Sequence, residues 1–89
     1  MKPSEVIKKY GWTQHQLGSE ETGFCILGAM FRAYGSFKPG APIVRRWLNA
    51  EAALLEHLRM EGEEDIIFWN DHPERTKQEV VALLQELGM

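Results

Sequence analysis

The segment from Trp69 to Thr76 reads WNDHPERT and gathers the side chains best suited to chemistry. A large aromatic residue is followed directly by short polar side chains, and an arginine lies close behind them. An aromatic surface with a few convergent polar groups is typical of small-ligand and peptide sites. The sequence therefore predicts a pocket whose floor is aromatic and whose rim is polar. Its predicted ligand-binding residues are Trp12, Trp69, Asn70, Asp71 and Arg75.

The same segment also fits a purely structural corner between two helices. Asp71 can accept hydrogen bonds from local backbone amides before Pro73, as in an Asx turn. Arg75 can pair either with Asp71 or with the last carbonyl groups of the preceding helix. Both interpretations explain the residue types present, and the partner of Arg75 distinguishes them.

Cys25 is the only cysteine of the chain and its one candidate nucleophile. A histidine base oriented by Asn70 or Asp71 would activate the thiol, and a position at a helix N-terminus would lower its pKa. The apolar neighbours Phe24 and Ile26 favour instead a small buried hydrophobic residue. We therefore assign no catalytic residue and treat a cysteine-dependent enzyme as the alternative hypothesis.

No metal site or cofactor is expected from the residues that usually bind them. One cysteine allows neither an internal disulfide nor a cysteine-based zinc site. His15, His57 and His72 are scattered without ligand spacing, although His57 has Glu61 one turn later. The glycines fit neither a dinucleotide-binding nor a phosphate-loop pattern.

Length and charge indicate one small globular domain over residues 1–89. Residues 1–50 carry seven Lys/Arg and three Asp/Glu (+4), whereas residues 51–89 carry three and ten (−7), giving −3 in total. This mild dipole contains no basic stripe, so nucleic-acid binding is not expected. No apolar run approaches the ~20 residues of a membrane span, and the polar N-terminus lacks a signal-peptide core. We expect a cytoplasmic protein without a membrane partner.

The apolar periodicity predicts an all-α fold, a compact bundle of four to five short helices around a central apolar helix over residues 23–34. Short strands over residues 24–27 or 66–69 are the alternatives at two places. Residues 13–22 read as a loop and residues 36–41 as a turn. The other helices are expected over residues 4–10, 42–60, 65–70 and 76–87.

Particular residues are expected to begin and pack these helices. Ser4 and Thr22 are candidate N-caps, and Thr76 with Glu79 forms a capping box. Gly28 belongs to a face of small residues that would let another helix approach closely. The buried stripe of the long helix is expected at Val44, Trp47, Leu48, Ala52, Leu55 and Leu58.

Four short patterns together resemble a family of small uncharacterised proteins of bacteria and phages. They read GW.Q from Gly11, C..GA from Cys25, WND from Trp69 and RT..EV from Arg75, and they span residues 11–80. Members often carry glycine where this chain has His15. The resemblance implies a stand-alone prokaryotic or viral domain of no assigned activity, whose motif residues build the fold or line one shared pocket.

The absence of a complete catalytic constellation favours a non-catalytic binding or regulatory module over an enzyme. If the protein is phage-encoded, it would act in the host cytoplasm by sequestering a small molecule or by occluding a host protein. The third hypothesis is a structural subunit or an obligate homo-oligomer. The apolar run from Ile66 to Trp69 would supply the exposed face for such an assembly.

Overall fold

The computed structural model describes residues 1–35 and 43–89, with the side chains of residues 43 and 44 excepted. In this part of the chain, the fold is mostly helical with one small hairpin, which confirms the predicted class. The elements are α1 (Pro3–Tyr10), β1 (Gly18–Ser19), β2 (Gly23–Phe24), α2 (Ile26–Tyr34), α3 (Ile43–Leu58), α4 (Glu63–Asp71) and α5 (Lys77–Glu86).

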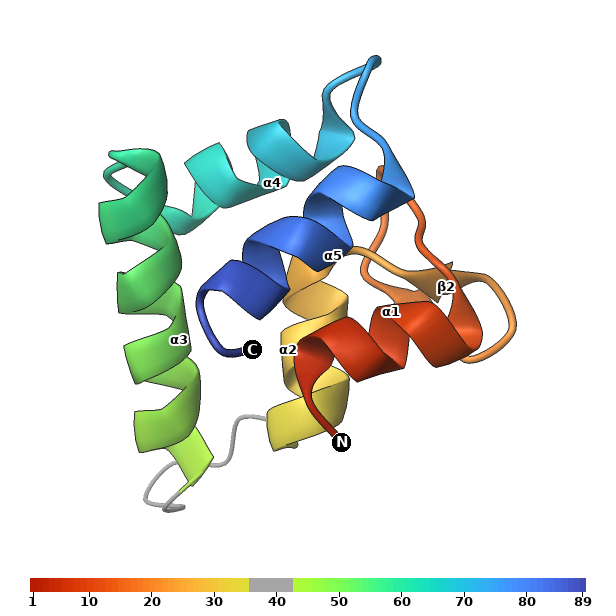
Figure 1. Cartoon of the computed structure of the whole chain (residues 1–89), viewed down its shortest axis with the longest axis horizontal. Coiled ribbons are helices and arrows are strands. Elements are labelled where there is room, and N and C mark those ends of the chain that lie inside the picture. Colours follow the sequence, from red (N-terminus) through yellow and green to blue (C-terminus); the bar gives the residue numbers. More distant parts are fainter. Residues whose placement is uncertain (36–42) are drawn as a thin grey trace.

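Helix α2 lies at the centre of the bundle (Figure 1). Helices α1, α3 and α4 all contact it, and α5 packs chiefly against α1. The Ser4 backbone N–H donates to the Met89 carbonyl at 2.9 Å, so the two ends of the chain lie side by side. The core consists of aliphatic side chains from all five helices, and those with almost no exposure are Val6, Ile7, Ile26, Leu27, Met30, Leu54, Ile66, Val80 and Leu84.

Helix α2 begins later than predicted, because Gly23 has a φ of +86° and cannot continue a right-handed helix. Gly23 and Phe24 instead pair antiparallel with Ser19 and Gly18. The predicted loop over residues 13–22 therefore contains a strand. Cys25, rather than Thr22, takes the N-cap position, and its Sγ accepts a hydrogen bond from the Gly28 amide at 3.3 Å.

The other helix starts are partly as predicted. Helix α1 starts at Pro3 with Lys2 as its N-cap, so Ser4 lies buried inside the first turn and does not cap it. A proline suits this position because its missing N–H has no helical partner there. In α5 the capping box is confirmed, since the Glu79 amide donates to Thr76 Oγ1 at 3.2 Å and the Thr76 amide to Glu79 Oε1 at 3.1 Å.

The buried stripe of α3 differs from the predicted one. Trp47 is buried and packs against Phe31 with ring centroids 5.2 Å apart, whereas Leu48 is 50% exposed. Ala50 and Leu54 are buried instead, because they follow Trp47 at helical spacing. Ala52 is exposed, and Leu55 and Leu58 are half-buried. Val44 and the turn predicted over residues 36–41 lie outside the described side chains.

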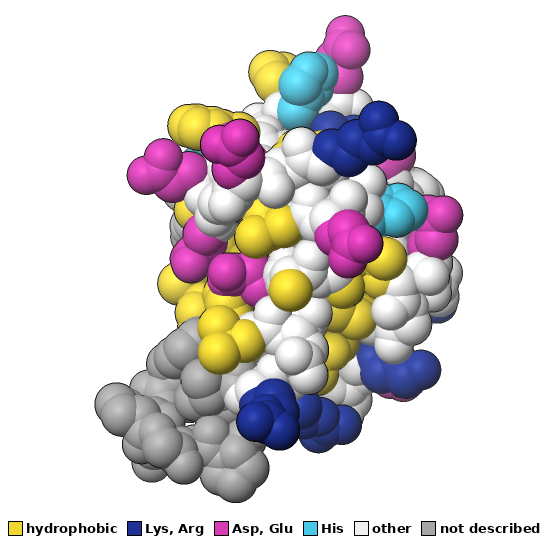
Figure 2. All heavy atoms as spheres, turned by 90° about the vertical axis from the view of Figure 1, so that its left-hand side faces the viewer, with side chains coloured by type: hydrophobic (Ala, Val, Ile, Leu, Met, Phe, Trp, Pro, Cys, Tyr) yellow, Lys and Arg dark blue, Asp and Glu magenta, His cyan; other side chains and the backbone are white. Residues whose placement is uncertain are grey.

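The segment over residues 65–70 is helical, which confirms the helix and excludes the strand alternative. Three acidic residues occupy the first turn of α4, where the positive end of the helix dipole favours them. Figure 2 shows the molecule from the side where α3 lies. Acidic, basic and hydrophobic side chains are interspersed on this face, with no basic stripe. None of the described helices is both long and apolar enough to span a membrane.

Gly28 is one of the positions where the fold leaves no room for a side chain. A Cβ atom there would lie 1.9 Å from the Leu17 carbonyl oxygen, so the neighbour that approaches Gly28 is the loop before β1 and not a second helix. The same carbonyl accepts the Cys25 amide at 3.1 Å and cannot move away without losing that bond.

We expect Gly28→Ala to lower the free energy of unfolding by about 2 kcal/mol, although alanine favours helices, because the loop must be displaced. Gly62→Ala is the matched control, since a Cβ at Gly62 would meet nothing within 4 Å. Urea denaturation of both variants checks this. Equal stability of the two variants would contradict the close approach.

Candidate functional site

The buried side chain of Asn70 joins three distant segments at the end of α4. It is 1% exposed. Its Oδ1 accepts the Trp12 indole N–H at 2.8 Å and the Ile26 backbone N–H at 3.0 Å. Its Nδ2 donates to the Thr13 carbonyl at 3.2 Å and to Asp71 Oδ1 at 3.0 Å. All four hydrogen-bonding positions of this carboxamide are thus used.

Gln14 and His15 attach the loop after α1 to the same corner. The Gln14 side-chain amide donates to the Asn70 carbonyl at 3.0 Å and to the His72 carbonyl at 2.8 Å, which satisfies backbone groups at the end of α4. The His15 amide donates to Asp71 Oδ1 at 2.9 Å. His15 has a φ of +67°, the region that favours glycine. The carboxylate of Asp71 therefore binds a distant loop and not the local amides of an Asx turn.

Arg75 stabilises the corner from its other side and does not pair with Asp71. Its Nε donates to the Trp69 carbonyl at 2.9 Å, and its guanidinium lies 3.9 Å from the centroid of the Trp69 ring. Its Nη1 lies 2.9 Å from Glu79 Oε2, and this bond is the main reason that the pKa of Glu79 is lowered. Of the two predicted partners of Arg75, the structure therefore shows a carbonyl group of the preceding helix and not Asp71.

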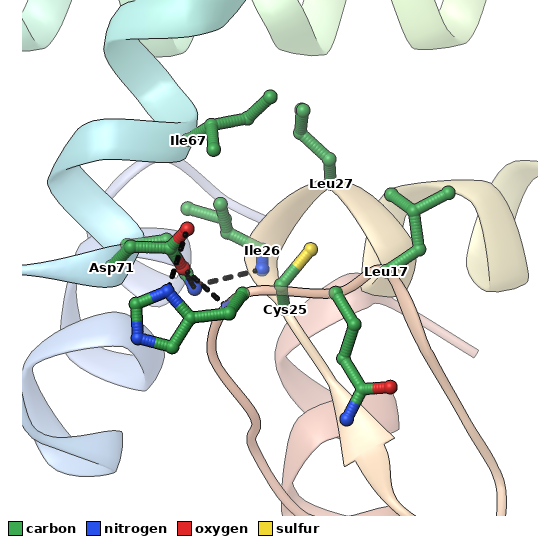
Figure 3. Close-up of a pocket in the computed structure, with 9 residues that line it drawn as sticks. Leu17, Cys25, Ile26, Leu27, Ile67 and Asp71 are labelled. Carbon is green, nitrogen blue, oxygen red and sulfur yellow. Dashed lines mark hydrogen bonds and ion pairs between the residues drawn. The ribbon is translucent and has the colours of Figure 1, made fainter.

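A pocket of about 250 Å³ opens between this corner and the start of α2. Its lining combines aliphatic and polar side chains, and Figure 3 shows Ile67, Leu27 and Leu17 around one side with Asp71 on the other. Leu17 is 53% and Ile67 39% exposed, so both lie at the surface. The lining residues are His15, Gln16, Leu17, Cys25, Ile26, Leu27, Ile67, Asn70 and Asp71.

Cys25 lines this pocket together with a histidine and a carboxylate, yet the three side chains do not form a catalytic triad. Figure 3 shows the sulfur directed toward Leu17 and Leu27 and away from Asp71. The imidazole Nδ1 of His15 lies 3.7 Å from Asp71 Oδ2. Burial raises the pKa of the Cys25 thiol, and the negative charge of Asp71 raises it further, despite amide hydrogen bonds at the helix N-terminus. A raised pKa disfavours the nucleophilic thiolate.

The five predicted ligand-binding residues separate into two groups. Asn70 and Asp71 line the pocket, whereas Trp12, Trp69 and Arg75 take part in the bonds that build the corner. Sequence reasoning missed His15, Leu17 and Ile67 as lining residues. No local pattern identifies them, because the loop meets the end of α4 across 56 residues of sequence.

The described residues contain no group of three or more His, Cys, Asp or Glu side chains placed to hold a metal ion. His57 lies 3.6 Å from Glu86 Oε2 and exposes its side chain to solvent. The pocket presents aliphatic side chains together with the oriented Asp71 carboxylate.

Asn70→Ala should lower the free energy of unfolding by about 3 kcal/mol, because it leaves the Trp12 and Ile26 donors without a partner. Asp71→Ala should cost only about 1 kcal/mol, since the His15 amide that it releases can bind water and Asn70 Nδ2 keeps its hydrogen bond to the Thr13 carbonyl. Chemical denaturation of the two variants measures the difference. A cost for Asp71→Ala as large as that for Asn70→Ala would contradict the separation between the structural and the pocket-lining residue.

Comparison with known proteins places the chain by sequence alone. No curated protein and no solved structure matches it. One family model, described as a family of unknown function (DUF6197), matches residues 3–87 and so covers nearly the whole chain. The chain therefore belongs to the family of unknown function DUF6197.

Proposed function

We propose that this protein is a small non-catalytic binding module whose ligand enters the pocket between α2 and the end of α4. The observation that carries the proposal is the contrast within this pocket. Its apolar walls come from three separate segments, and its one carboxylate is held in place by the hydrogen bonds of Asn70 and His15. A pocket with a few fixed polar groups among apolar walls is the usual form of a ligand site.

The pocket limits the size of the ligand group that it can enclose. Its volume of about 250 Å³ holds about eight liquid water molecules at ~30 Å³ each, and hence a ligand portion of about eight non-hydrogen atoms. Ligands of this size bind weakly unless their contacts are very efficient. The expected role is thus the capture of a small metabolite or of one protruding group of a larger molecule.

We also propose that the protein works in the cytoplasm of a bacterium or of a phage-infected host, where it would act by sequestering this ligand. A free cysteine is consistent with a reducing compartment. A phosphorylated ligand is not supported, because the pocket presents the Asp71 carboxylate and its lining residues include no lysine or arginine.

A fragment screen followed by ¹H–¹⁵N NMR tests the binding proposal. Fragments that bind should shift the amide signals of Leu17, Leu27 and Ile67. In Ile67→Trp, where the larger side chain fills the mouth of the pocket, those shifts should disappear. Phe68→Trp is the matched control, since Phe68 is 70% exposed and does not line the pocket. Hits that persist in Ile67→Trp, or no hits at the pocket, would refute the proposal.

Labelling with a thiol reagent separates binding from cysteine catalysis. Because Cys25 is 7% exposed and burial raises its pKa, we expect it to react slowly in the folded protein at neutral pH. One equivalent of reagent should react rapidly once the protein is denatured. Rapid labelling of the folded protein would instead favour the enzyme alternative.

A further inference from the structure

We propose that the pocket selects a small organic cation, with its apolar body between Leu17, Leu27 and Ile67 and its charged nitrogen on the Asp71 carboxylate. This inference rests on the proposed binding function and names the ligand class that the same pocket takes. The chemical class is an alkyl or aryl ammonium or guanidinium group.

The position of Asp71 along its helix is the first argument. It is the last residue of α4 and so lies at the negative end of the helix dipole, where the Trp69 and Asn70 carbonyls accept hydrogen bonds from Arg75 and Gln14. The last turn of α4 itself contains no basic residue, and the Arg75 guanidinium that reaches its Trp69 carbonyl pairs with Glu79 and not with Asp71. A carboxylate at the negative end of a helix is unfavourable by itself, and a bound cation would relieve the repulsion.

The hydrogen bonds around Asp71 leave one of its oxygens available. Oδ1 accepts from the His15 amide and from Asn70 Nδ2, which fixes the orientation of the carboxylate. In the described part of the chain, no donor lies within hydrogen-bond distance of Oδ2. The imidazole Nδ1 of His15 lies 3.7 Å from Oδ2, and the His15 side chain is 75% exposed.

The neighbouring N-terminus of α2 does not neutralise Asp71 directly. Its Ile26 amide donates to Asn70 Oδ1, and its Gly28 amide donates to Cys25 Sγ. The positive end of this helix is therefore directed at neutral acceptors. Two of the described arginines form ion pairs with other carboxylates, Arg32 with Glu20 and Arg75 with Glu79.

The apolar walls determine the rest of the ligand. Ile26 and Leu27 form the inner surface and are almost fully buried, whereas Leu17 and Ile67 reach the surface. A chain of about six carbons with one terminal nitrogen matches the roughly eight atoms that the pocket holds. An ammonium group attached to such a chain could reach the carboxylate while the carbons stay out of water.

Three six-carbon probes with a cationic, a neutral and an anionic head group test the inference. Hexylammonium, hexanol and hexanoate are titrated into the protein at neutral pH and low salt, and the Leu17, Leu27 and Ile67 amide signals are followed by ¹H–¹⁵N NMR. We expect hexylammonium to bind at least tenfold more tightly than hexanol, and hexanoate not to bind. Asp71→Asn should weaken hexylammonium binding about tenfold.

Glu74→Gln is the matched charge control, because Glu74 is an exposed acid near the corner that does not line the pocket. It should change hexylammonium binding less than twofold. Equal binding of hexylammonium and hexanol, preference for hexanoate, or unchanged binding in Asp71→Asn would overturn the cation inference. The probe series in the unaltered protein is decisive even if Asp71→Asn fails to fold. If neutral or anionic fragments bind and are lost in Ile67→Trp, the binding proposal survives while this inference fails.

Discussion

The carboxamide of Asn70 is the interaction on which the rest of this structure depends. It accepts hydrogen bonds from donors 58 and 44 residues earlier in the chain, on Trp12 and Ile26. The Trp12 donor is a side-chain indole N–H, and the Ile26 donor is a backbone amide in the first turn of α2, which has no intrahelical acceptor. Unpaired polar groups buried inside a domain of 89 residues would consume a large part of its stability. One neutral side chain that both donates and accepts satisfies them without burying a charge.

The pocket follows from this constraint. Once Asn70 fixes the end of α4 against the start of α2, the loop after α1 is held over the gap by Gln14 and His15. The Leu17 carbonyl then approaches α2 so closely that only glycine fits at position 28. The space enclosed by these three segments has apolar walls because their inward side chains belong to the edge of the core. His15, Gln16 and Asn70 line it as well, and the partly exposed carboxylate of Asp71 gives the pocket its chemical character.

Periodicity along the chain predicted most of the helices, because each one buries a single apolar face. It predicted the start of α2 incorrectly. The apolar residues of this helix extend back to Phe24, but the backbone of Gly23 is left-handed and the helix begins only at Ile26. The WND triplet was identified as important from residue types alone, and its two polar members do line the pocket. The separate roles of Asp71 and Arg75 were not predictable. Arg75 donates to the Trp69 carbonyl and not to Asp71, and no local sequence pattern determines this partner.

Amide hydrogen exchange at Ile26, together with exchange of the Trp12 indole N–H, tests the central role of Asn70 most directly. An amide in the first turn of a helix has no intrahelical acceptor and normally exchanges quickly. If the Asn70 carboxamide holds both groups as described, both should exchange only with global unfolding, at the rate of the α2 core amides. Exchange of either group as fast as an unprotected loop amide would contradict the account.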